Sequence, residues 1–71
     1  MELETPVTGV VWKVVAPLGT RVTAGNPVVI VESMKMEIPV EAPADGTVTE
    51  ILVAEGDSVE QDDPVAVVEI D

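Results

Sequence analysis

Valine and other β-branched residues recur in short runs along the chain, and glycine, proline, asparagine or aspartate separates the runs. Runs of this kind, bounded by turn residues, are typical of β-strands. No window has apolar residues at the spacing of a long amphipathic helix. The pattern therefore predicts strands at residues 10–16, 28–33, 38–42, 47–53 and 65–70.

The segment EIPVEA alternates the apolar residues Ile38, Val40 and Ala42 with two glutamates and Pro39. This period of two predicts a strand with one face in a core and an acidic face in water. Because proline cannot donate a hydrogen bond to a neighbouring strand, Pro39 predicts an edge strand or a bulge.

The chain matches itself without a gap when it is shifted by 37 positions. The stretch TGVVWKVVAPLGTRVTAGNPVVIVE then lies over DGTVTEILVAEGDSVEQDDPVAVVE, with Gly19 aligned to Gly56. Two repeats, 1–34 and 38–71, account for all but three residues. The three that remain are Lys35, Met36 and Glu37.

Two equivalent β halves that cannot each bury an apolar face alone should pack together about a pseudo-twofold axis. The repeat predicts an all-β fold, a flattened barrel or sandwich of two short antiparallel four-stranded sheets, also called a barrel-sandwich hybrid. We expect one domain, 1–71, in which a tight hairpin at Lys35 joins the repeats opposite the chain termini. Edge strands with proline and glutamate favour a monomer.

The composition argues against an enzyme that acts alone. The chain has 71 residues, near the lower limit for a stable single core, and it has no cysteine and no histidine. It therefore lacks the commonest general base, the most reactive nucleophile and the usual transition-metal ligands. We expect no catalytic residue and no metal site in it.

The charge is strongly negative, with a formal net value of −11 from fourteen acidic and three basic residues. Binding to nucleic-acid phosphates or anionic lipid is therefore unfavourable. With no signal-peptide pattern and no apolar stretch of about 20 residues, we expect a soluble cytoplasmic protein.

The acidic surface fits two explanations equally, adaptation to high salt or recognition of a partner. Near the hairpin, Glu32, Glu37 and Glu41 fit a solvated strand face better than electrostatic steering.

Lys35 is one of only two lysines and has no counterpart in the other repeat. A lysine in a turn is ordinarily just a solvated residue. Here Met34 and Met36 flank it and place flexible apolar surface where turns usually carry polar residues. Lys13, by contrast, aligns with Glu50 inside a strand and fits an ordinary outward-facing position. The Met-Lys-Met turn therefore indicates a surface that another protein recognises.

The segment ESMKMEIP resembles the attachment motif of biotinyl domains, in which a Met-Lys-Met turn presents the lysine that a biotin protein ligase acylates. The internal duplication is similar to the biotinyl and lipoyl domain family over essentially the whole chain. By this resemblance Lys35 would carry covalent biotin. The ligase would read a turn formed by Glu32, Ser33, Met34, Met36 and Glu37.

The resemblance implies a carrier of a cofactor rather than a catalyst. A biotin carboxylase would place carboxylate on the tethered ring, and a carboxyltransferase would move it to an acceptor. Ser33 stands where the family most often has alanine, and the first repeat lacks the inserted thumb of some bacterial acetyl-CoA carboxylase carriers. The chain is more similar to the thumbless domains of propionyl-CoA, pyruvate and related carboxylases, to those of biotin-dependent decarboxylases, and to small free-standing attachment proteins.

Two other interpretations stay open. The first is a lipoyl carrier of a 2-oxo acid dehydrogenase complex, whose motif usually has aspartate before the lysine and a small residue after it, so Met34 and Met36 disfavour it. The second is an unmodified structural module in which Lys35 stays bare.

Two further expectations concern residues away from the lysine. Trp12, the only aromatic residue, aligns with Thr49 and is expected to pack in or beside the core rather than contact a partner. The glycines are expected to form turns, and they are Gly19, Gly25, Gly46 and Gly56.

Overall fold

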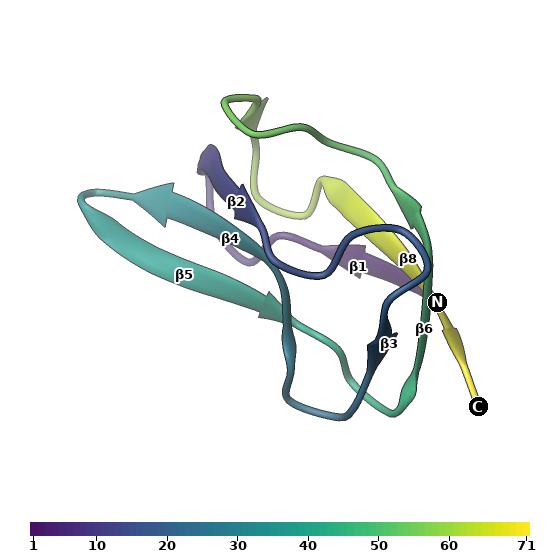
Figure 1. The fold of residues 1–71 in the computed structure, drawn as a ribbon. Helices are drawn as coiled ribbons and strands as arrows, with labels where there is room; N and C mark the ends of the chain where they lie inside the picture. Colours follow the sequence, from purple (N-terminus) through teal and green to yellow (C-terminus); the bar gives the residue numbers. More distant parts are fainter.

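A computed structural model describes all residues, 1–71, as eight β-strands without a helix (Figure 1). The strands are β1 (Glu2–Glu4), β2 (Gly9–Val14), β3 (Arg21–Val22), β4 (Pro27–Ser33), β5 (Met36–Glu41), β6 (Gly46–Ile51), β7 (Ser58–Val59) and β8 (Pro64–Ile70). The predicted runs correspond to β2, β4, β5, β6 and β8. The other three strands have two or three residues, which is too short for an alternating pattern to be visible in the sequence.

The strands form two four-stranded antiparallel sheets, ordered β1-β8-β6-β3 and β5-β4-β2-β7. The predicted all-β sandwich of two short sheets is therefore confirmed. β5 lies at the edge of its sheet, as Pro39 indicated, and Pro39 pairs there with Ile30. The fold contains no helix, and therefore none that could cross a membrane.

The strands recur at the spacing of the sequence repeat. The bounds of β2, β3 and β4 lie 37 residues before those of β6, β7 and β8. Exchanging these pairs, and β1 with β5, converts the order of one sheet into that of the other. Each sheet thus takes two strands from each repeat, so neither repeat can complete a sheet alone.

The core lies between the sheets and consists of fourteen buried apolar side chains, mostly valines. Short β-branched side chains fit both the pleated strands and the narrow space between two closely packed sheets. Val31 of β4 and its equivalent Val68 of β8 are fully buried. Val31, which lies close to the lysine hairpin, therefore faces the core.

Two glycines are required by close approach of strands rather than by turns. A Cβ at Gly46 would overlap the backbone carbonyl oxygen of Glu69, and a Cβ at Gly9 would overlap that of Glu32. The prediction that Gly46 forms a turn is therefore wrong, because it begins β6 with ordinary strand geometry. The other three glycines predicted as turn formers have positive φ, as expected.

β2 and β6 each contain a bulge at equivalent positions. In β2, Val11 pairs with Val31 and Lys13 with Ile30, so that Trp12 is the extra residue. The bulge in β6 leaves Thr49 extra in the same way. A bulge interrupts the alternation of a strand, and Trp12 and Lys13 both face solvent. The expected packing of Trp12 against the core is thus wrong, since 48% of its surface is exposed.

Candidate functional site

Lys35 occupies a two-residue turn between β4 and β5, in the hairpin that projects from one end of the molecule (Figure 1). Ser33 and Met36 form the last strand pair below the turn. Met34 and Lys35 have φ values of 51° and 65°. Positive φ at both central residues is the requirement of a type I′ turn, whose twist matches that of the two flanking strands.

This backbone conformation is unfavourable for the residues that adopt it. Type I′ turns strongly prefer Asn-Gly or Asp-Gly, and a non-glycine residue in the left-handed region costs on the order of 1 kcal/mol or more. The other positive φ values lie at Gly19, Gly25, Gly56 and Asp62. Such strain persists where the surrounding strands hold it, and it is concentrated at functional sites.

The side chains of the turn stand in solvent. Met34 is 93% exposed and Met36 63% exposed, and Lys35 is exposed between them. The one ion pair of the structure joins Arg21 to Asp71, so no carboxylate holds the amine of Lys35. The turn therefore presents an uncommitted primary amine between two large apolar side chains.

Below the turn the outward-facing residues are acidic. Glu32 pairs directly across the strands with Glu37, and both are exposed, as is Glu41 at the end of β5. Like charges directly opposite each other destabilise a strand pair. Ser33 is half-buried and is the next residue after Val31 on the inward-facing side of β4. The predicted turn residues are thus all within one hairpin, with the glutamates on its outer face.

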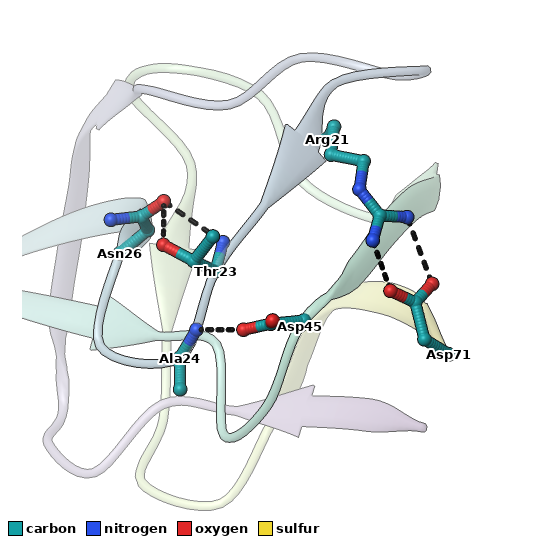
Figure 2. Close-up of polar contacts among 6 residues, drawn as sticks. All are labelled: Arg21, Thr23, Ala24, Asn26, Asp45 and Asp71. Carbon is teal, nitrogen blue, oxygen red and sulfur yellow. Dashed lines mark hydrogen bonds and ion pairs between the residues drawn. The ribbon is translucent and has the colours of Figure 1, made fainter.

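At the far end of the molecule the turns are fixed by polar contacts (Figure 2). Arg21 donates two hydrogen bonds to the carboxylate of Asp71, which raise the pKa of Arg21 and lower the pKa of Asp71. The backbone N–H of Ala24 donates to Asp45 at 2.9 Å. The two ends of the domain therefore differ, since the lysine hairpin has no contact of this kind.

Comparison with known proteins agrees with this geometry. A family model described as Biotin-requiring enzyme matches residues 7–68. The fold superimposes on urea carboxylase of Kluyveromyces lactis with a TM-score of 0.93 and 45% sequence identity, over 97% of this chain. A single-chain, multi-domain long-chain acyl-CoA carboxylase gives a TM-score of 0.94 and 32% identity over the whole chain. Comparison with curated protein sequences gave no match.

A small all-β sandwich that presents a lysine on a projecting hairpin has the architecture of a cofactor attachment domain. The chain belongs to the biotinyl and lipoyl domain family. Its structural neighbours are carboxylases, of which it spans only 6% and 7% of the length. It is thus equivalent to one small part of each of those proteins.

Proposed function

We propose that Lys35 is the biotin attachment residue of a biotin carboxyl carrier domain formed by residues 1–71. The observation that carries this proposal is the turn itself. An exposed lysine without a carboxylate partner occupies a strained two-residue turn that glycine or asparagine would form at lower free energy. A hairpin with only a structural role would be more stable with the preferred turn residues. A lysine that must be acylated, by contrast, has to be accessible, as Lys35 is in this turn.

The chain itself contributes position rather than catalysis. The Nζ atom of Lys35 attacks the acyl carbon of a biotinyl adenylate, the bond from that carbon to the phosphate oxygen breaks, AMP leaves and the amine loses a proton. The product is an amide, so the positive charge of the side chain is lost. When attached, biotin would supply the chemistry, as a group that can carry carboxylate between two active sites. β4 and β5 hold the base of the arm, which keeps the group at a high effective concentration near its partners.

Three partners follow from this function, namely a biotin protein ligase, a biotin carboxylase and a carboxyltransferase, all acting in the cytoplasm. The two carboxylases that the domain resembles support the last two. The ligase would contact the turn through Met34 and Met36, with contributions from Glu32, Ser33 and Glu37. The exposure of both methionines supports direct contact.

Intact-mass measurement tests the attachment. The protein is incubated with ATP, biotin and a biotin protein ligase and, in parallel, with a lipoate ligase and lipoate. We expect a single biotinyl addition, which peptide mapping assigns to Lys35. Lipoylation alone would replace the proposal by a lipoyl carrier, and no addition in either reaction would favour an unmodified structural module.

The second lysine provides a matched control. Lys13 is also exposed, but it lies in β2 rather than in a turn. Lys35→Arg should abolish the mass addition and Lys13→Arg should leave it unchanged, with both proteins folded. Biotin on Lys13, or retained addition in Lys35→Arg, would contradict the proposal.

A further inference from the structure

The internal repeat permits a position-by-position comparison of the outer faces of the two sheets. Four outward positions of the sheet β5-β4-β2-β7 are Val10, Trp12, Ile30 and Pro39. The positions 37 residues away, on the outer face of the other sheet, carry Thr47, Thr49, Val67 and Glu2. At these four positions only the sheet that bears the lysine hairpin is thus mainly apolar, although Lys13, opposite Ile30, and Glu32, opposite Val10, are charged residues of the same face.

The two bulges show that this difference is not required by the fold. At the bulge of β6, the hydroxyl of Thr49 donates a hydrogen bond to the carbonyl of Val67 within the same sheet, at 3.3 Å. At the equivalent bulge of β2, Trp12 exposes 48% of its surface, and the neighbouring Val10 exposes 43%. Since threonine satisfies this position in one sheet, the large aromatic side chain in the other needs a reason outside the domain.

These residues lie in the same sheet as the lysine hairpin and close to its base. Val10 pairs with Glu32, and Glu32 pairs with Glu37, one strand pair below the turn. Only the pair of Ser33 and Met36 lies between this Glu32–Glu37 pair and the turn. A protein that encloses the turn therefore reaches this part of the sheet as well.

We propose that Val10, Trp12 and Ile30, here called the tryptophan face, form a docking surface for the biotin protein ligase. The inference rests on the proposed function of Lys35. A ligase must bring its bound acyl carbon into bonding distance of Nζ, so it has to receive the hairpin down to its base. The biotin carboxylase and the carboxyltransferase act on the biotin ring at the far end of the attached arm, so their chemistry does not require them to receive the base of the hairpin.

The negative charge of this chain indicates which residues the complementary surface of the ligase contains. The charged residues beside the tryptophan face are three exposed glutamates, Glu32, Glu37 and Glu41, and one lysine, Lys13, and the whole chain has a net charge of −11. The matching ligase surface is therefore an apolar patch bordered by arginine or lysine. The apolar contact sets the affinity, and the glutamates accelerate the encounter at low salt.

Steady-state biotinylation kinetics with the carrier as the varied substrate test the proposal. Trp12→Thr installs the residue that the other sheet carries at this bulge. A buried tryptophan is a frequent source of interface affinity, so we expect KM for the carrier to rise about tenfold or more, while kcat stays within about twofold. Trp12→Phe should restore most of the affinity, because it returns an aromatic surface.

Leu18→Thr is the matched control. Leu18 is 67% exposed but lies in the loop that joins β2 to β3, beyond the end of β2 that is remote from the hairpin. Its KM should equal that of the wild type. Thermal unfolding verifies that each variant is folded. If Trp12→Thr lowers the unfolding midpoint, Val10→Thr replaces it as the test variant, with the same expected rise of KM.

The outcomes separate this inference from the proposed function. A wild-type protein that the ligase does not biotinylate overturns both. Normal biotinylation of Lys35 with an unchanged KM in Trp12→Thr overturns the docking surface alone. An equal rise of KM in Leu18→Thr would also overturn it, because the effect would then not belong to this face.

Discussion

The lysine turn differs from the turns of residues 23–26 and 60–63 in the contacts that stabilise it. In the latter two, a side-chain oxygen of Asn26 or Asp63 accepts the backbone N–H of Thr23 or Glu60 at 2.9 Å. The lysine turn has two left-handed residues and no side-chain hydrogen bond. Where a turn only reverses the chain, local polar contacts stabilise it. Where it presents an amine, the strands below must supply the stability.

The first and largest expected effect concerns that support. Val31→Asp would bury a carboxylate in the fully apolar core, and we expect it to destabilise the domain by about 3 kcal/mol or more, enough to unfold it. Val68→Asp, the equivalent change in β8, should act equally. Chemical denaturation followed by circular dichroism measures both. A folded Val31→Asp protein would show that the hairpin does not depend on the core.

A second test compares the two repeats at their closest strand contacts. Gly9→Ala and Gly46→Ala each introduce a Cβ that overlaps a carbonyl oxygen of the neighbouring strand. We expect each to cost on the order of 1–3 kcal/mol, with similar values for the two, because overpacking must be relieved by backbone movement. Urea denaturation midpoints provide the measurement. Losses that differ strongly between the two would contradict the structural equivalence of the repeats.

A third test removes the strain of the lysine turn. Replacing Met34 by asparagine and Lys35 by glycine installs the preferred type I′ sequence, and we expect the domain to gain about 1–2 kcal/mol while losing all biotinylation. Met34→Asn alone should give part of the gain and keep the lysine. If the double variant is no more stable than the wild type, the turn is not strained.

A fourth test weakens the polar turns. Asn26→Ala and Asp63→Ala each remove one acceptor of a backbone N–H, and water can replace it because both turns are exposed. The expected loss is about 0.5–1.5 kcal/mol for each, without effect on biotinylation. Differential scanning calorimetry and the mass assay measure the two quantities. A fall in modification would show that these turns and the lysine hairpin are coupled.

The smallest effect concerns the exposed pair of Arg21 and Asp71. Its hydrogen bonds lower the pKa of Asp71, so the stabilisation is complete above the pKa that aspartate has in the unfolded chain. It is lost as the pH falls through the lowered pKa of the folded state. Asp71→Asn should therefore change the unfolding midpoint only slightly at neutral pH and not at strongly acidic pH. A large difference under acidic conditions would contradict this assignment.

Local patterns were informative where strands are long and where the repeat has identical residues. They indicated the five longer strands and the edge position of Pro39. They could not indicate the two-residue strands, whose existence depends only on pairing with distant strands. They also gave Trp12 the wrong environment, because the bulge that turns it outward arises from the pairing of β2 with β4.

The sequence by itself determined the duplicated all-β architecture, the family, and the one lysine without a counterpart, because these follow from residue types and their spacing. Only the tertiary structure decided that each sheet combines strands of both repeats and that Gly9 and Gly46 separate touching backbones. It also decided that an apolar face adjoins the lysine hairpin. The reason is physical, since strand register and close approach are properties of segments far apart in the chain, which no local pattern records.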